Sequence, residues 1–224
     1  MGASPASGKG MRRFLESWRL FWVLALIVSV AISLGLPSTD LHSGRGVEHL
    51  ILRSVRCALP LFLLAFSASS LAILWPNRLT RWLLANRRYI GLAFAFAMAW
   101  HLSFVAYSIL LFGNQLNARA TALDLVGLAF LLMLTLTSFR WAARRVSRAN
   151  WRRLHKTGVY VIWFLATYIY LGNVRGGGDR LHYAGLGLLL AAWLLRVAAW
   201  IKRRSRYPAV GDSPILSGSP RSSR

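Results

Sequence analysis

The chain has 224 residues, of which 56% are hydrophobic and only 15% are charged. Soluble globular domains carry about 25% charged residues, and the apolar residues here gather in blocks close to the roughly 20 residues that a helix needs to cross a bilayer. The formal net charge of +22 falls mostly in short segments between these blocks, which is how membrane topology is set. The composition therefore excludes a soluble domain, argues against nucleic-acid binding, and predicts an all-α, polytopic membrane protein.

Six apolar blocks follow one another along the chain, and we expect each to form one helix of a six-helix transmembrane bundle. They cover residues 20–36, 55–75, 89–112, 120–139, 157–171 and 181–201. The fifth block has only 15 residues, fewer than the roughly 20 required, so its helix is predicted to begin before residue 157.

The basic residues in and beside the loops divide unequally between the two sides of the predicted bundle. Twenty-one lie on one side and six on the other, and an excess of Lys and Arg marks cytoplasmic segments. We therefore expect a cytoplasmic N-terminal segment 1–17, a transmembrane domain 18–206 and a disordered cytoplasmic tail 207–224, which is rich in Ser, Pro, Gly and Arg. These segments leave no room for a nucleotide-binding domain, so an electron donor or a substrate-processing domain must be another molecule.

Cysteine and histidine limit the metal chemistry open to the chain. The single cysteine, Cys57, excludes an intrachain disulfide and any thiolate metal cluster, because these need two or more thiolates. The five histidines are the remaining nitrogen ligands: His42, His49, His101, His155 and His182.

Two of these histidines are predicted to lie inside the membrane, where an ionisable side chain is costly and by default functional. His101 is thirteen residues beyond Arg88, about 20 Å along the third helix. The early start of the fifth helix draws His155 into the membrane as well. Two imidazoles on separate helices suit a six-coordinate b-type haem, and Gly158 would leave space beside His155. The alternatives are a buried histidine hydrogen-bonded to a neighbouring helix for His101 and an interfacial histidine for His155.

Two stretches resemble the ferric-reductase-like transmembrane domain family. Residues 87–101, RRYIGLAFAFAMAWH, are similar to the third-helix pattern of that family, and residues 151–156, WRRLHK, to its fifth-helix pattern. Within the family the chain is similar to the haem-binding membrane subunits of bacterial methionine sulfoxide reductase systems. The resemblance implies a multi-pass protein of the bacterial inner membrane that carries electrons within or across the membrane. It also implies a haem b with axial ligands His101 and His155, and a separate redox protein or a quinone or flavin donor. Because only these two histidines are predicted to lie within the bundle, we expect one haem per chain.

The chain departs from the family pattern at Tyr168, where members usually carry a second histidine on the fifth helix, thirteen residues after the first. A tyrosine there favours packing or an interfacial position over haem ligation. It also leaves open an alternative function, a cofactor-free membrane anchor or assembly subunit. Whether the chain is itself an enzyme is not determined by the sequence.

The remaining polar candidates have plainer interpretations. His42, His49 and His182 are predicted to be solvated at the outer surface, and Asp124 to lie near the start of the fourth helix, where the helix dipole favours an acid. A metal or proton transporter that uses these residues is a weaker hypothesis, since no helix shows the broken centre of such sites.

Overall fold

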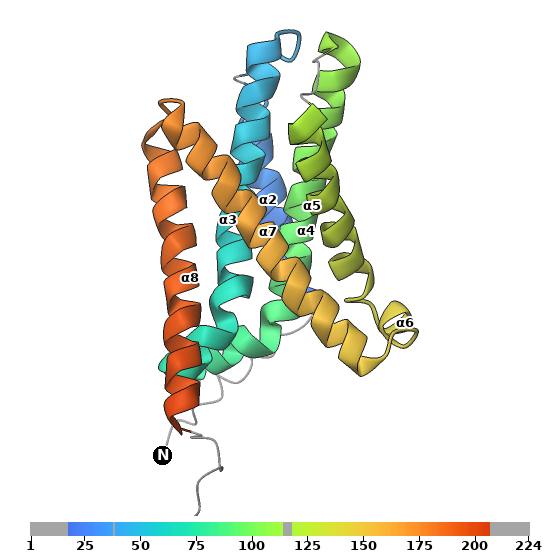
Figure 1. Cartoon of the computed structure of the whole chain (residues 1–224). Helices are drawn as coiled ribbons and strands as arrows, with labels where there is room; N and C mark the ends of the chain where they lie inside the picture. Colours follow the sequence, from blue (N-terminus) through green and yellow to red (C-terminus); the bar gives the residue numbers. More distant parts are fainter. Residues whose placement is uncertain (1–17, 38, 114–117, 207–224) are drawn as a thin grey trace, which may run out of the picture.

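The computed structural model describes residues 18–37, 39–113 and 118–206, so the predicted segments 1–17 and 207–224 lie outside the described residues. The described residues form only helices, which run alternately up and down (Figure 1). In chain order they are α2 (Trp18–Ser33), α3 (Gly44–Leu74), α4 (Arg78–Phe112), α5 (Ala118–Leu136), α6 (Arg140–Ala143), α7 (Arg148–Arg175) and α8 (Arg180–Arg206).

The six longer helices correspond to the six predicted apolar blocks. Four of them, α3, α4, α7 and α8, are long and apolar enough to cross a membrane, whereas α2 and the apolar part of α5 are shorter. Large hydrophobic side chains remain exposed along the helices; Leu110 is 82% exposed and Leu34 is 70% exposed. An apolar surface of this extent is stable only in contact with lipid or protein, which confirms an all-helical, multi-pass membrane protein.

Helix ends fall where polar side chains satisfy the free backbone groups. Ser43 caps α3 by accepting a hydrogen bond from the Gly46 N–H at 3.1 Å, and Asn77 and Thr80 form a reciprocal capping box on α4. Gly113 ends α4 with a φ of 58°, a left-handed conformation that glycine adopts without strain.

The capped start of α3 corrects the predicted start of the second helix at residue 55. Because Ser43 provides the first hydrogen bond, the helix begins at Gly44 and continues through a polar stretch before the apolar block. His49, Arg53 and Arg56, which the sequence assigned to the outer side, therefore lie on the first turns of α3.

The early start predicted for the fifth helix is confirmed, since α7 begins at Arg148 and Ser147 caps it. The sequence did not predict α6, a single turn between α5 and α7.

Helix α3 lies at the centre of the packing. One buried cluster joins α3 to α2 and α4 and includes Ile32, Ala58 and Ala93. A second joins α3 to α7 and α8 and includes Phe66, Tyr170 and Leu189. At the end of α3, Lys202 from α8 donates a hydrogen bond to the Leu74 carbonyl at 2.8 Å.

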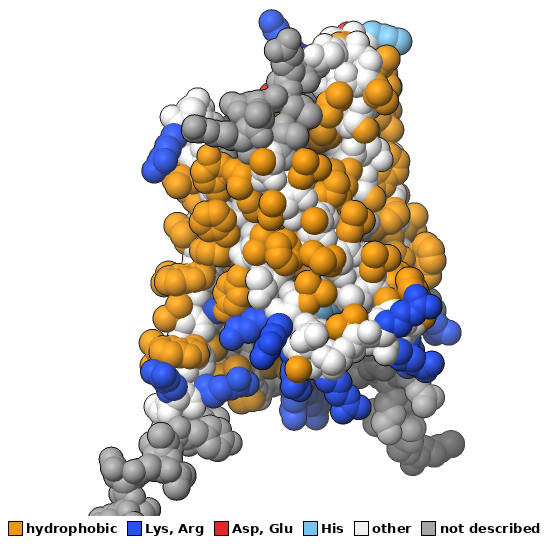
Figure 2. Space-filling model, turned by 45° about the vertical axis from the view of Figure 1, so that its right-hand side comes forward, with side chains coloured by type: hydrophobic (Ala, Val, Ile, Leu, Met, Phe, Trp, Pro, Cys, Tyr) orange, Lys and Arg blue, Asp and Glu red, His pale blue; other side chains and the backbone are white. Residues whose placement is uncertain are grey.

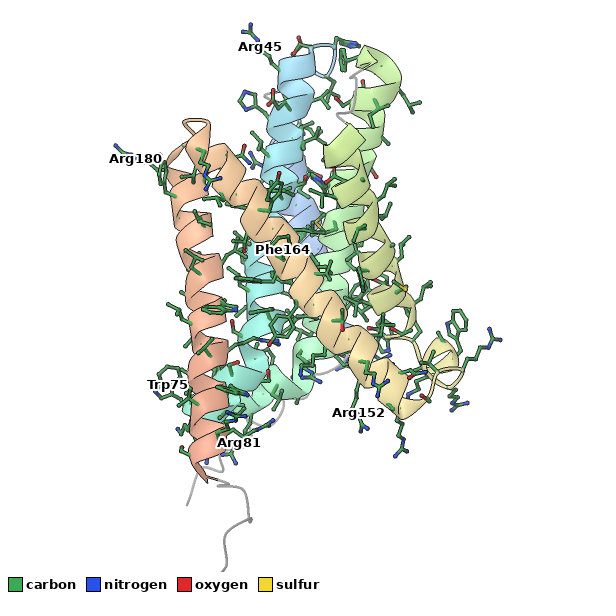
Figure 3. The ribbon with its side chains drawn as sticks, in the orientation of Figure 1. Arg45, Trp75, Arg81, Arg152, Phe164 and Arg180 are labelled. Atoms are coloured by element: carbon green, nitrogen blue, oxygen red, sulfur yellow. The ribbon has the colours of Figure 1, made fainter. Side chains whose placement is uncertain are left out.

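Basic side chains gather at one end of the bundle. Figure 2 shows Lys and Arg along the lower rim, below a body covered by hydrophobic side chains. Arg81 and Arg152 lie at this end, which we call the basic end, and Arg45 and Arg180 lie at the opposite end (Figure 3). The beginning of α2 shares the basic end, because Trp18 stacks on Phe139 next to α6, and the end of α8 lies there as well (Figure 1).

Candidate functional site

A cavity of about 590 Å³ opens near the basic end, between α3, α4, α5, α7 and α8. We call it the basic-end cavity. Its volume falls within the range of roughly 300–1,000 Å³ that is usual for ligand sites. It is lined by Phe62, Ala65, Phe66, Leu84, Ala85, Arg87, Arg88, Gly91, Leu92, Phe94, Leu131, Leu134, Thr135, Thr137, Ser138, Arg140, Ala143, Trp151, Arg152, His155, Lys156, Val159, Ile162 and Arg196.

The wall toward the bundle interior is apolar. Phe62 and Phe66 are 5% and 1% exposed, and the Phe62 ring lies 5.3 Å from that of Phe94, centroid to centroid. A methyl group built at Gly91 would meet no atom within 4 Å, so this glycine faces open space. The arrangement suits a flat, apolar ligand that approaches the backbone of α4.

The lining is also strongly cationic. Six basic side chains line the cavity, and none of the described lining residues is acidic. The Nε atom of Arg88 is buried and has no hydrogen-bond partner. A buried donor without a partner is costly, so the cationic part of the lining is suited to the carboxylates or phosphates of an anionic ligand.

His155 is the single histidine among the described lining residues, and cysteine and methionine are absent from that set. Its Nε2 lies 3.0 Å from Thr137 Oγ1, and its ring centroid lies 4.1 Å from that of Trp151. Trp151 in turn donates a hydrogen bond from Nε1 to the Thr137 carbonyl at 3.0 Å. A metal-binding imidazole needs one nitrogen free and the other fixed by a partner, and Thr137 provides such a partner.

Arg196 is a site residue that the sequence analysis missed. It is the only basic residue inside the apolar block 181–201, and the criterion applied to the histidines, an ionisable group within an apolar helix, would have identified it. Its guanidinium donates hydrogen bonds from Nε and Nη2 to the Phe66 carbonyl at 3.3 and 3.2 Å.

The structure does not bring His101 into the basic-end cavity. His101 Nδ1 lies 3.3 Å from Ser54 Oγ and 3.4 Å from the Ile51 carbonyl oxygen, both on α3. Because a carbonyl oxygen only accepts, this contact assigns the ring proton to Nδ1 and leaves the lone pair on Nε2. On α4, His101 is seven residues beyond Phe94, or about 10 Å farther from the basic end.

Gly158 has a different role from the predicted one. A methyl group there would lie 3.0 Å from Leu134 and 3.1 Å from Phe130, so Gly158 allows close packing of α7 on α5. The open glycine beside the cavity is Gly91.

The remaining predicted residues lie away from the cavity. His42, His49 and Asp124 are exposed, and Tyr168 is 56% exposed on α7. His182 pairs with Asp179, whose Oδ1 lies 2.7 Å from its Nδ1. Desolvation acts to raise the pKa of Asp179, but hydrogen bonds from the His182 backbone and from Arg56 outweigh it and lower the pKa. No group of three metal-binding side chains occurs in the part of the chain that the structure describes.

Three features of the basic-end cavity are suited to a haem. The open space at Gly91 leaves room for a flat macrocycle, His155 provides a nitrogen ligand, and the orphaned Nε of Arg88 lies where a propionate carboxylate could accept a hydrogen bond. The second axial ligand of a six-coordinate iron is missing from the lining.

Comparison with known proteins identifies similar chains among curated proteins. The protein-methionine-sulfoxide reductase heme-binding subunit MsrQ of Yersinia pseudotuberculosis serotype O:1b (strain IP 31758) is 32% identical over 199 residues, which cover 83% of this chain and 92% of that protein. MsrQ of Yersinia pestis (strain Pestoides F) is also 32% identical over 199 residues, 83% of this chain and 90% of its own. No family model and no solved structure matches the chain.

Proposed function

This chain belongs to the MsrQ family of haem-binding subunits, and on that premise we propose that it is a b-type haem-binding membrane subunit that transfers electrons to or from a separate redox partner. The basic-end cavity is the observation that carries the proposal, because it combines a histidine, an apolar wall and basic side chains in one space. A bound haem would supply reversible one-electron chemistry at its iron.

The residues of the cavity have separate tasks in this proposal. His155 binds the iron and is oriented by Thr137. Phe62 and Phe66 exclude water from the macrocycle, and Arg88 and Arg152 bind the propionates, because a guanidinium pairs well with a carboxylate.

His101 is proposed as the second axial ligand. It is the other histidine inside the bundle, and its Nε2 carries the free lone pair. Its hydrogen bonds to α3 are 3.3 and 3.4 Å long, longer than the roughly 2.7–3.2 Å that is usual between a nitrogen donor and an oxygen acceptor. The contacts with Ser54 and Ile51 involve Nδ1 alone, so they are compatible with iron binding at Nε2.

The name of the relatives indicates the class of partner. They are subunits of a protein-methionine-sulfoxide reductase, so we propose that the electrons reach a separate subunit that reduces methionine sulfoxide in proteins. The donor on the basic side is proposed to be a quinone, a flavin or another redox protein.

Haem content tests this proposal directly. We expect the purified protein to show a low-spin b-type spectrum that changes on dithionite reduction, with one haem per chain in a pyridine haemochrome assay. His101→Ala should lose the low-spin signature, because one imidazole is removed, and His42→Ala, at an exposed position, is the matched control.

Each other result has a definite meaning. Protein made with ample haem and containing none would favour the alternative, a cofactor-free anchor. A ratio near two haems per chain would require a further iron ligand such as Tyr168 or His182. A normal low-spin spectrum in His101→Ala would remove His101 from the ligand set.

The topology of the proposed six-span bundle is a second expectation. Reporter fusions after Arg206 and within the segment 140–153 should both indicate the cytoplasm, because basic segments stay on that side. A fusion near Gly177, between α7 and α8, should indicate the opposite side. A non-cytoplasmic reporter after Arg206 would contradict both the span count and the proposed orientation.

A further inference from the structure

Among the described residues that line the basic-end cavity, Arg196 is the one cation that topology does not explain. It lies ten residues before the end of α8, about 15 Å along the helix. Its partner Phe66 lies eight residues before the end of α3, about 12 Å inward of the Leu74 carbonyl that Lys202 binds. The basic residues beyond Lys202 are placed for the positive-inside rule, whereas Arg196 is placed within the bundle.

Its side chain is held there rather than extended toward the surface. The guanidinium carbon lies 4.1 Å from the centroid of the Phe66 ring and 4.8 Å from that of Tyr160. Two hydrogen bonds to the Phe66 carbonyl add to these cation–π contacts. Arginine side chains near helix ends usually reach to the interface, so contacts from α3 and α7 fix this one against the cavity.

Among the described residues, no acidic side chain neutralises the charge of Arg196. The described carboxylates are Asp40, Glu48, Asp124 and Asp179, and the ion pairs found among the described residues join Asp179 to Arg56 and His182. Carbonyl and ring contacts orient a guanidinium without cancelling its charge. A full positive charge therefore acts on the cavity that holds His155.

We propose that Arg196 is a charge-bearing residue that raises the reduction potential of the haem in the basic-end cavity, an inference that rests on the proposed function. The iron gains one electron with no bond formed or broken at Arg196, so the site becomes one charge less positive. A fixed cation favours that state. A unit charge acting across about 10 Å at an effective dielectric constant of about 20 changes such an equilibrium by roughly tenfold.

Potentiometric titration with dithionite, followed by absorption, tests the inference on the purified full chain. In Arg196→Gln we expect the equilibrium constant for reduction to fall by about tenfold, roughly 59 mV for one electron, while Arg196→Lys keeps the wild-type potential. Arg204→Gln is the matched control, because the Arg204 guanidinium lies over the Trp200 ring at 4.4 Å on the same helix but does not line the cavity. A wild-type potential in Arg196→Gln, or an equal fall in Arg196→Lys, would overturn the inference.

A second pair of variants covers the case in which Arg196→Gln fails to fold or loses haem. Ala65 lines the same cavity as Arg196, so Ala65→Glu adds a negative charge to the cavity lining while Arg196 stays in place. If a charge on this lining acts on the haem, the reduction potential of Ala65→Glu should be lower than that of Ala65→Gln. Equal potentials would overturn the inference. An absence of haem from the wild-type protein would instead refute the proposed function.

Discussion

His155→Ala is expected to lower haem affinity by about 100-fold or more, because it removes the single described metal ligand that lines the cavity. Loss of the hydrogen-bond partner that orients a metal ligand typically lowers metal affinity by about 10–100-fold. Loss of the ligand itself should lower haem affinity by at least the upper end of that range. Haem titration of protein purified without the cofactor, followed by absorption, measures the change.

Thr137→Val provides the graded comparison for this expectation. It removes the hydroxyl that lies 3.0 Å from His155 Nε2 and keeps the size of the side chain, so affinity should fall by roughly 10–100-fold. His49→Ala, an exposed position on α3, should bind haem as the wild type does. Tight binding by His155→Ala would place the cofactor outside the basic-end cavity.

The helical architecture could be predicted because it depends on local composition. Each apolar block corresponds to one helix of the structure, including the fifth, whose 15 residues are fewer than the roughly 20 that a spanning helix needs. The ends were less predictable, since they depend on caps rather than on hydropathy. The start of α3 is an example, because Ser43 caps the helix and its first residue is Gly44 rather than the predicted residue 55.

Only part of the site could be predicted, because the contacts that hold a side chain come from other helices. His155 was identified because the short fifth block forced α7 to begin early. Arg196 satisfies the same rule about ionisable groups in apolar helices, yet its contacts come from Phe66 and Tyr160 on two other helices. The sequence places such a residue in the membrane but does not show which neighbours hold it.

The two glycines show the same limit. Gly158 stands one turn after His155 and suggested space for a macrocycle, whereas the structure packs Leu134 and Phe130 against it. A glycine in a helix allows another group to approach the helix backbone closely. Only the tertiary structure shows whether that group is a ligand or another helix.

Gly91→Leu should therefore abolish haem binding and leave the protein folded. No atom lies within 4 Å of a methyl group built at Gly91, so the Cβ atom of the new side chain meets no neighbour and its outer carbons have the space of the basic-end cavity. Replacing a helical glycine removes a penalty of about 0.8–1.0 kcal/mol, so the haem-free protein should be slightly more stable than the haem-free wild type. Thermal unfolding in detergent and the pyridine haemochrome assay measure the two effects separately.

Gly158→Ala is the matched variant, because we expect it to lower stability and to leave haem binding intact. Its methyl group would lie about 3 Å from Leu134 and Phe130, and overpacking of this kind costs roughly 1–3 kcal/mol, of which the about 0.8–1.0 kcal/mol gained by replacing a helical glycine offsets a part. We therefore expect a lower unfolding temperature for Gly158→Ala, with haem retained by the molecules that fold. Haem bound at wild-type affinity by Gly91→Leu would contradict the assignment of this cavity, because a leucine and a macrocycle cannot share the space beside Gly91.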